Sequence, residues 1–507
     1  MKAQTQKSAT PVAPEGAPKT NSYDLQPPPA LLDFMVTAWK PRSGKLPPRV
    51  RGHERFHARR RALSALFPGE TLVIPTGHEK VRANDTSYRF RPGTDFYYLC
   101  GNQEADCVLM MVPLPGGGHR DLLFVEPNPG KTDKTFFTDR AKGELWVGPR
   151  LGVSESGARF AVHEARGLSE LKEAVEGLHA RGAHRPWRLL RGIDPELDGQ
   201  LRAQDERDKA FSVALSEMRL RKDALEISEL KKAIASTRRG FEDVIRKLPE
   251  STTERWVEGV FNLRARVEGN DVGYGTIAAA GHHACTLHWV DNDGPIRRGD
   301  LLLLDAGVEA HTLYTADITR TLPISGRFSK EQKQIYELVL EAQRAAFGHC
   351  KPGSEFLDPH RAAMRVLAHG LERLGILPMS AEEALREEHQ FYKRYSLHGV
   401  SHMLGLDVHD CAKARNEVYK FGKLEPGMVL TVEPGLYFQT DDLTVPARYR
   451  GIGVRIEDDV VITAKGCTIL SDDIPRETAE VERWMAELWG KGPRSRATVR
   501  TQKPKRR

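Results

Sequence analysis

Four carboxylates and one histidine in the second half of the chain are of the types that bind divalent cations. They are Asp305, Asp317, His402, Glu433 and Glu457. Asp305 and Glu433 each end an apolar run, where a buried and unpaired charge would be costly. Carboxylates with one imidazole suit two hard or borderline cations, and two cations with a bridging water are typical of a hydrolase. Taken singly, such residues are more often turn or ion-pair residues, so the prediction of a metal site rests on the whole set.

The histidines near His402 exclude one common zinc motif. His398 and His402 are four residues apart, and His409 follows seven residues later. Glycine stands at position 399, where the H-E-x-x-H motif has its general-base glutamate, so a single-zinc protease of that class is disfavoured. His288 is a further candidate for the same site.

The segment around Glu457 shows how a strand could present charge to a site. Side chains alternate along a strand, so Arg455 and Glu457 should face one way while Val454 and Ile456 face the other. One face then packs against the core, and the other carries the charged groups.

Length and composition limit the classes of protein to which this chain could belong. A chain of 507 residues suggests two or more domains. No apolar run approaches the roughly 18 residues that span a bilayer, and the first residues lack the apolar segment of a secretory signal. The six cysteines are scattered without a C-x-x-C pair, which argues against a cysteine zinc site and a disulfide framework and favours a reducing cytoplasm.

The basic charge lies mostly at the C-terminus. Residues 491–507 carry eight basic and no acidic residues, and subtracting those eight from the net charge of +7 leaves −1 for the rest of the chain. Such a tail could contact nucleic acid, but no aromatic residue is interleaved to stack on bases. We therefore expect residues 489–507 to be a basic disordered tail, without a nucleic-acid partner.

Composition divides the remaining chain into three segments. Residues 1–47 are rich in Pro, Ala, Lys and Thr and are expected to be a flexible extension, with an apolar patch at 31–39 that could dock elsewhere. Residues 48–215 should form an α/β domain, with helices at 53–66 and 168–178 and strands at 71–75, 96–99, 107–112 and 121–125. Residues 216–488 should form an α+β domain, with helices after the capping boxes at 223–226 and 329–332 and strands at 301–304, 429–432 and 454–456.

Several segments together resemble one known family. The motifs are Leu-Asp-Ala-Gly at 304–307, Asp-Ile-Thr-Arg-Thr at 317–321, His-Gly-Val-Ser-His at 398–402, Thr-Val-Glu-Pro-Gly-Leu-Tyr at 431–437 and Arg-Ile-Glu-Asp at 455–458. The set strongly resembles Xaa-Pro aminopeptidase (aminopeptidase P), a pita-bread metallopeptidase. The stretches at 94–101 and 144–152 are similar to the N-terminal domain of that family, so the resemblance covers roughly residues 51–487. It implies an α+β fold, with a pita-bread catalytic domain preceded by a smaller α/β domain.

The resemblance also implies a role for each residue of the site. Asp305 would bind one metal, Asp317 and Glu457 would bridge both, and His402 and Glu433 would complete the other. Glu433 would also be catalytic, with further catalytic groups at His288, His398, His409 and Arg455. Asp95 and Tyr437 would join Arg455 in a supporting hydrogen-bonded group. The cofactor would be two Mn²⁺ ions, with Co²⁺ or Zn²⁺ as substitutes.

The implied activity is release of the first residue from peptides with proline at the second position. The family analogy suggests a homo-oligomer, a dimer or tetramer. We expect the protein in the cytoplasm, without a membrane partner. Prolidase, which cuts only dipeptides, is the nearest alternative, and a non-catalytic pita-bread binding module is another. Methionine aminopeptidase is disfavoured because it lacks the large upstream domain. One departure is the interval of twelve residues from Asp305 to Asp317, one longer than the family pattern. We expect the extra residue in a hairpin turn around 309–313, with the ligands intact.

Overall fold

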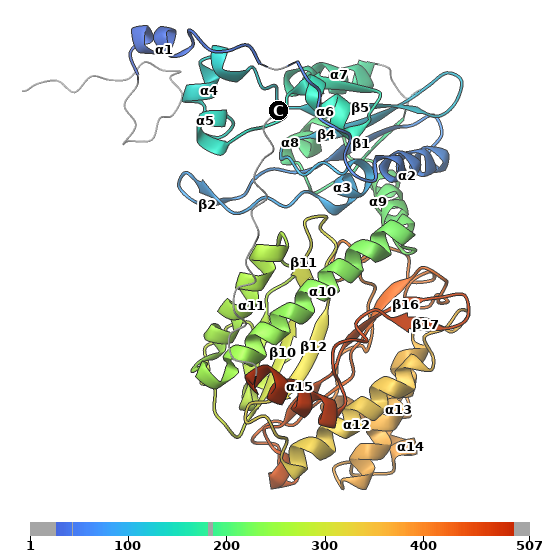
Figure 1. Cartoon of the computed structure of the whole chain (residues 1–507). Coiled ribbons are helices and arrows are strands. Elements are labelled where there is room, and N and C mark those ends of the chain that lie inside the picture. Colours follow the sequence, from blue (N-terminus) through green and yellow to red (C-terminus); the bar gives the residue numbers. More distant parts are fainter. Residues whose placement is uncertain (1–26, 43, 181–185, 491–507) are drawn as a thin grey trace, which may run out of the picture.

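The computed structural model describes residues 27–42, 44–180 and 186–490 and shows two bodies of secondary structure (Figure 1). The N-terminal body, drawn in blue to teal, lies above the C-terminal body, drawn in green to red. Helix α9 (Asp205–Met218) leads from one to the other, and α10 (Ala224–Lys247) follows after a short link. None of the helices in these ranges is both long and apolar enough to cross a membrane.

A five-stranded mixed sheet forms the centre of the N-terminal body, in the order β6-β5-β4-β1-β7. Its strands are β1 (Thr71–Pro75), β4 (Val108–Pro113), β5 (His119–Val125), β6 (Glu164–Gly167) and β7 (Trp187–Leu189). Helix α2 (His53–Leu66) packs on one face and α7 (Leu171–Ala180) on the other. Because both faces are covered, the central strands are apolar at nearly every position. The predicted helix at 53–66 and the predicted strands at 71–75, 107–112 and 121–125 are confirmed.

One predicted strand of this body is wrong. Residues 96–99 lie in helix α3 (Thr94–Cys100), which is closed by Gly101 in the left-handed region at φ 73°. All residues from Phe96 to Cys100 are buried. A short apolar run without periodicity does not distinguish a buried strand from a buried helix, and the aromatic residues favoured the strand.

Part of the N-terminal extension packs on this body. Residues 29–35 form helix α1 (Pro29–Met35), and the Trp39 ring lies 6.3 Å from the ring of Phe137. Arg42 Nη1 donates to Asn128 O at 2.7 Å. The apolar patch at 31–39 thus docks at its C-terminal end on the N-terminal body. Residues 1–26 and the basic tail from residue 491 lie outside the described residues.

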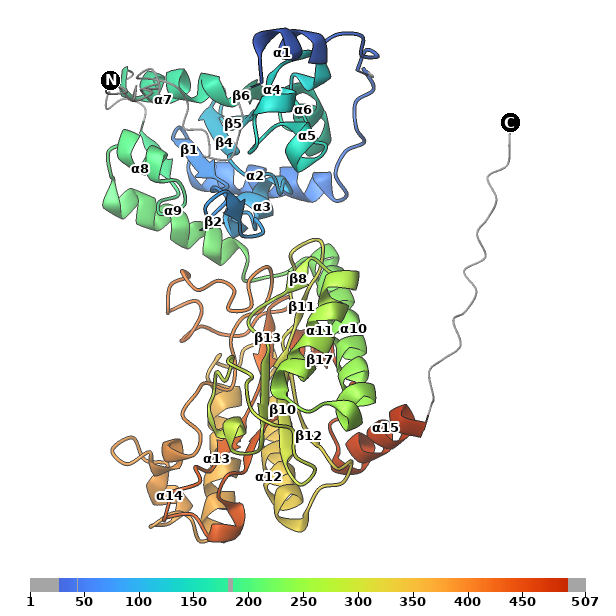
Figure 2. The same ribbon diagram turned by 90° about the vertical axis from the view of Figure 1, so that its left-hand side faces the viewer.

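The C-terminal body places short sheets between two pairs of helices (Figure 2). Its first half contains α10, α11 (Glu254–Glu268) and the antiparallel strands β9 (Ile277–Ala280), β10 (Leu301–Ala306) and β12 (Ile318–Pro323). Its second half contains α12 (Lys330–Phe347), α13 (Asp358–Arg373) and the strands β13 (Val429–Val432), β14 (Gly435–Tyr437), β15 (Gly453–Arg455) and β16 (Asp458–Ile462). The strands predicted at 301–304 and 429–432 are confirmed, and the one at 454–456 is β15, which ends one residue earlier than predicted.

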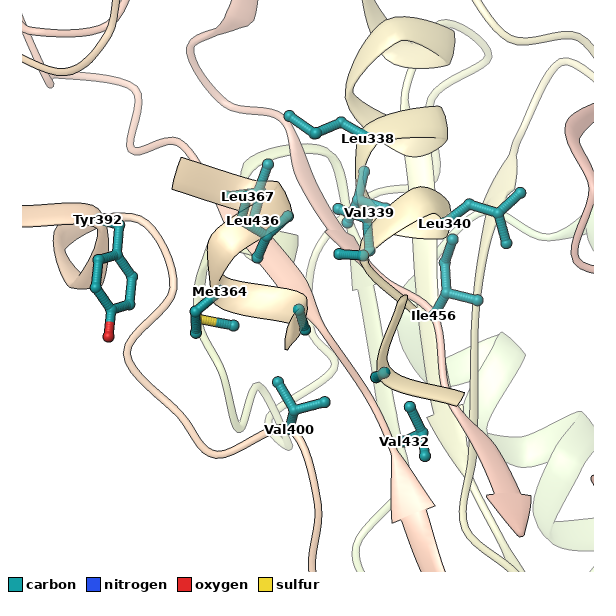
Figure 3. Packing of buried hydrophobic residues seen from close by; sticks show 14 of the residues in the cluster. Leu338, Val339, Leu340, Met364, Leu367, Tyr392, Val400, Val432, Leu436 and Ile456 are labelled. Atoms are coloured by element: carbon teal, nitrogen blue, oxygen red, sulfur yellow. The ribbon is translucent and has the colours of Figure 1, made fainter. Parts of the chain in front are cut away.

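Local sequence and packing explain why these elements form. Asp223 Oδ1 accepts from Glu226 N at 3.0 Å while Glu226 Oε2 accepts from Asp223 N at 2.9 Å, which confirms the capping box of α10. The box at 329–332 begins α12 in the same way. Leu338 and Val339 of α12 pack with Leu367 of α13 against residues of the strands in an apolar cluster (Figure 3).

The hairpin between Asp305 and Asp317 contains the expected turn. After β11 (Val308–Glu309), the chain turns at 310–313, where Leu313 N donates to Ala310 O at 2.8 Å and Leu313 has φ 64°. Asp305 remains on β10 and Asp317 directly precedes β12. The turn therefore lies where we expected it, away from both carboxylates.

Gly307 provides a test of how tightly this hairpin packs. A Cβ at Gly307 would lie 1.7 Å from the carbonyl oxygen of Ala316, on the strand partner. We expect Gly307→Ala to lower the free energy of unfolding by about 1–3 kcal/mol through overpacking, measured by urea denaturation. In the control Gly259→Ala, within α11, the new Cβ meets nothing within 4 Å, so stability should be equal or higher. Equal stability of both variants would contradict the tight packing.

Candidate active site

All five predicted metal ligands line one cavity of the C-terminal body. The cavity has a volume of about 530 Å³ and lies among residues from both halves of that body. Its polar side is formed by Asp305, Asp317, His402, Glu433 and Glu457. The sequence separates these residues by up to some 150 positions, so only the fold brings them together.

Backbone pairing between strands fixes the Cα positions of the ligand residues. Asp305 of β10 stands opposite Thr319 of β12. Thr431 N of β13 donates to His402 O at 3.0 Å, and Glu457 N, in the link from β15 to β16, donates to Thr319 O at 3.1 Å. Three separate strand ends thus converge on one point.

Three of the five predicted ligands have donor atoms close enough to share a cation. One donor atom from each of Asp317, His402 and Glu457 lies within 4.8 Å of the others. His402 Nε2 is 3.3 Å from Asp317 Oδ2 and 3.5 Å from Glu433 Oε1. The arrangement is oxygen-rich with one nitrogen donor, which suits a hard or borderline divalent cation.

Burial makes the negative charge of this cluster costly. It raises the pKa of Glu433 to about 8, and burial together with the neighbouring Asp317 raises the pKa of Glu457. Burial opposes a charge on His402, yet the carboxylates of Asp317 and Glu433 raise the pKa of that imidazole to about 9. Arg455 is the fixed positive charge among the lining residues that the structure describes. The donor set therefore fits divalent cations, whose charge would compensate the carboxylates.

Arg455, Tyr437 and His398 form a hydrogen-bonded chain beside the carboxylates. Arg455 Nη2 donates to Asp305 Oδ2 at 2.6 Å, and Arg455 Nη1 donates to the Tyr437 hydroxyl at 3.0 Å. His398 Nδ1 lies 2.8 Å from Gly399 O, which can only accept, so His398 Nε2 accepts from the Tyr437 hydroxyl at 2.7 Å. Burial, reinforced by Arg455, lowers the pKa of His398 to about 4, so this imidazole is neutral at physiological pH.

The structure does not bring Asp95 into this group. Asp95 lies in the first turn of α3, where its carboxylate forms an ion pair with Arg219 of the link between the two bodies. It is not among the residues that line the cavity. His288 and His409 do line it, and both are exposed there. The ring of His409 lies 4.4 Å from that of His402.

Two contributors were not predicted from the sequence. The Tyr274 hydroxyl lies 2.7 Å from Asp305 Oδ1 and also contacts Asp317 Oδ1. Thr319 Oγ1 donates to Glu457 Oε2 at 2.6 Å. Thr319 could have been found from strand alternation, because it lies two residues after Asp317. Tyr274 stands in no recognisable motif, so only the tertiary structure identifies it.

Comparison with known proteins agrees with this site. Residues 228–464 match the family model described as Metallopeptidase family M24, and residues 56–185 match that of Aminopeptidase P, N-terminal domain. Xaa-Pro aminopeptidase 1 of Streptomyces coelicolor is 54% identical over 85% of this chain and 87% of its own length. Xaa-Pro aminopeptidase 2 of the same organism is 51% identical over 85% and 91%. The chain belongs to the Xaa-Pro aminopeptidases of metallopeptidase family M24.

Solved structures show the same architecture. The Pseudomonas aeruginosa aminopeptidase PepP matches with a TM-score of 0.77 at 33% identity, over 87% of this chain and all of that one. Aminopeptidase P from Escherichia coli with the inhibitor Pro-Leu matches with a TM-score of 0.76 at 30% identity, with the same coverage. The predicted α+β pita-bread domain after a smaller α/β domain is confirmed. Membership of a metallopeptidase family implies that the enzyme uses a divalent metal.

Tyr274 tests whether the cavity is built for a cation. Removing its hydroxyl in Tyr274→Phe frees the two carboxylates that it orients, so Mn²⁺ affinity should fall by about 10- to 100-fold in calorimetric titration. Tyr395→Phe is the matched control, because its hydroxyl contacts Thr444 at 2.7 Å, outside the cavity lining. Equal affinities in the two variants would contradict a supporting role for Tyr274.

Proposed function

We propose that this chain is a dinuclear-metal aminopeptidase that releases the first residue from peptides with proline second. The observation that carries the proposal is the convergence of four carboxylates and one histidine in a cavity that also has an apolar wall. The named Xaa-Pro aminopeptidases to which the chain is similar support the same substrate class.

We propose for the metal ligands the roles that the family resemblance implies. Asp305 would hold one cation, Asp317 and Glu457 would bridge two, and His402 and Glu433 would complete the second. Lewis-acid activation of water and of the scissile carbonyl is the chemistry that such a site supplies when metal is bound. Mn²⁺ is proposed as the ion because the donors are mainly carboxylate oxygens, with Co²⁺ or Zn²⁺ as substitutes.

The side chains around the ligands suggest how the reaction proceeds. Glu433 reaches into the cavity from the end of β13 and would carry a proton to the leaving proline nitrogen. Both ring nitrogens of His398 are engaged, by Gly399 O and by the Tyr437 hydroxyl. His288 and His409, which are exposed in the cavity, are therefore better placed to donate to the developing oxyanion, a role worth about 2.7–4 kcal/mol for one donor.

The apolar wall suggests how proline is recognised. The nitrogen of a prolyl peptide bond carries no hydrogen, so proline must be selected by the shape of its ring. The cavity offers apolar side chains from Ile277, Leu287, Val290 and Val408 beside the polar cluster. The polar side of the cavity would receive the free α-amino group of a substrate.

Other features of the proposal concern the whole chain. All six cysteines are free thiols, which supports a reducing cytoplasm. We propose a homo-oligomer, a dimer or tetramer. We also propose domain limits of 48–215 and 216–488, although the first limit falls in the last turn of α9, which continues to Met218. The segment limits 1–47 and 489–507 fit the structure only in part, because 29–35 form α1 and 489–490 end helix α15 (Thr478–Gly490). Residues 1–26 and 491–507 lie outside the described residues.

A peptide-length series tests the substrate. With Mn²⁺ supplied, the protein should release the first residue from an Xaa-Pro-Yaa tripeptide, measured by chromatography of the free amino acid, and a chelator should stop the release. The control is the same tripeptide with alanine second, which should be cut far more slowly. Cleavage of Xaa-Pro dipeptides alone would identify a prolidase. Folded, Mn²⁺-loaded protein that cuts neither peptide would reject the enzyme and favour a binding module.

Glu433 tests the mechanism. Replacing its carboxyl group in Glu433→Gln should lower kcat by at least about 10²-fold, because proton transfer is lost, while circular dichroism shows an unchanged fold. Glu425→Gln is the control, since that carboxylate pairs with Arg221 at 3.0 Å on the surface. Full activity of Glu433→Gln would contradict the proposed role.

A further inference from the structure

We propose that the N-terminal body positions the catalytic loop that carries His409, with Arg91 as the main positioning residue. The loop consists of residues 405–410 and is called the His409 loop below. Its catalytic consequence rests on the proposed function, whereas the attachment itself is a property of the fold.

Arg91 joins two parts of the C-terminal body with one guanidinium group. Arg91 lies just before α3, and its Nε donates to Glu309 Oε2 at 2.6 Å. Its Nη2 donates to Leu406 O at 2.6 Å and lies 3.2 Å from Asp407 Oδ1. Glu309 belongs to the hairpin between Asp305 and Asp317, so Arg91 ties that hairpin to the His409 loop. A planar fork of donors can hold both partners at once, which a lysine cannot.

The partner on the hairpin is itself held in place. Glu309 is buried on β11, and its other oxygen accepts from Asn270 Nδ2 at 2.7 Å. Within the C-terminal body, Thr315 N donates to Gly405 O at 3.0 Å. The hairpin therefore provides a fixed base against which Arg91 can hold the loop.

Further contacts hold the two acidic residues on either side of Val408 and His409. Thr94 Oγ1 donates to Asp407 Oδ1 at 2.6 Å. Arg219 Nε donates to Asp410 Oδ1 at 2.9 Å, and Lys222 Nζ lies 3.1 Å from Asp410 Oδ2. Arg219 is also paired with Asp95 of α3, which links this second attachment to the N-terminal body.

These contacts lie outside the cavity, whereas the middle of the loop lies inside it. Val408 and His409 line the cavity, and the His409 ring is 4.4 Å from that of His402. The loop is also tightly packed, since a Cβ at Gly405 would lie 2.2 Å from Asp410 Oδ2. A misplacement of about 1 Å in a reacting group can cost about 10²-fold in rate. The position of His409 therefore depends on side chains from another body of the protein.

The experiment follows the loop itself by amide hydrogen exchange, in metal-free and in Mn²⁺-supplied protein. In Arg91→Met, which keeps the apolar stem, exchange of residues 406–410 should quicken by about tenfold or more, because hydrogen bonds to a charged group are lost. Thr94→Val removes the bond to Asp407 and the bond that Thr94 accepts from Arg91 Nη1, with little change of volume. It leaves the Arg91 bonds to Glu309 and Leu406 and should quicken exchange in the same segment by a smaller factor. In the peptide assay, kcat of Arg91→Met should fall by about 10- to 100-fold with KM nearly unchanged.

The matched control is Arg51→Ala. Arg51 joins the same two bodies through a 3.5 Å contact with Glu229 of α10 but does not touch the His409 loop. Exchange in 406–410 and kcat should therefore stay at the level of the unaltered protein. The proposal is overturned if Arg91→Met leaves exchange in 406–410 unchanged, or if Arg51→Ala quickens it equally. If the unaltered protein cuts no peptide, the proposed function fails, while the exchange measurement still decides whether the loop is held.

Discussion

Four carboxyl groups share one cavity, and the rest of the site is arranged around the repulsion between them. Removing a carboxylate from water is costly, and placing a second one beside it raises the cost further. Three neighbours offset part of this repulsion. The positive charge comes from Arg455, and hydroxyl donors come from Tyr274 and Thr319. These neighbours compensate only part of the charge. The negative charge that remains uncompensated explains why such a cluster is suited to bind divalent cations.

The same constraint explains the layout of the C-terminal body. Four of the ligands lie at or near the end of a short strand, and His402 lies in a loop whose backbone pairs with Thr431 of β13. The strands come from two halves that pack face to face between helices (Figure 2). The apolar residues of α12 and α13 fix the second half, and those of α10 and α11 fix the first. A rigid apolar frame is needed because like charges would otherwise move apart. Packing energy from the cores thus holds together a polar cluster that could not assemble by itself.

The N-terminal body belongs to this account because it contacts the loop that carries Val408 and His409 into the cavity. Arg91 and Thr94, before and at the start of α3, bond to the segment that contains His409, and Asp95 pairs with Arg219 of the link. The buried pairs of Arg219 and Lys222 with Asp410 extend the contact through the link. Breaking one partner of a buried ion pair leaves an uncompensated charge, so this contact also resists separation of the two bodies.

Much of the site could be predicted from the sequence, because ligand types follow from chemistry and strand ends follow from apolar runs. The five ligands stand in motifs that are specific enough to be recognised together. The order of the predicted helices and strands indicated the fold class. The segment 96–99 was misassigned because a run buried on all sides has no periodicity to read. The contacts of Tyr274 with the carboxylates and of Asp95 with Arg219 could not be predicted, because no local sequence pattern indicates either one. The amino-acid sequence by itself thus determined which groups are available for metal chemistry, whereas only the tertiary structure decided which of them meet, because a contact between residues distant along the chain depends on the packing of every element between them.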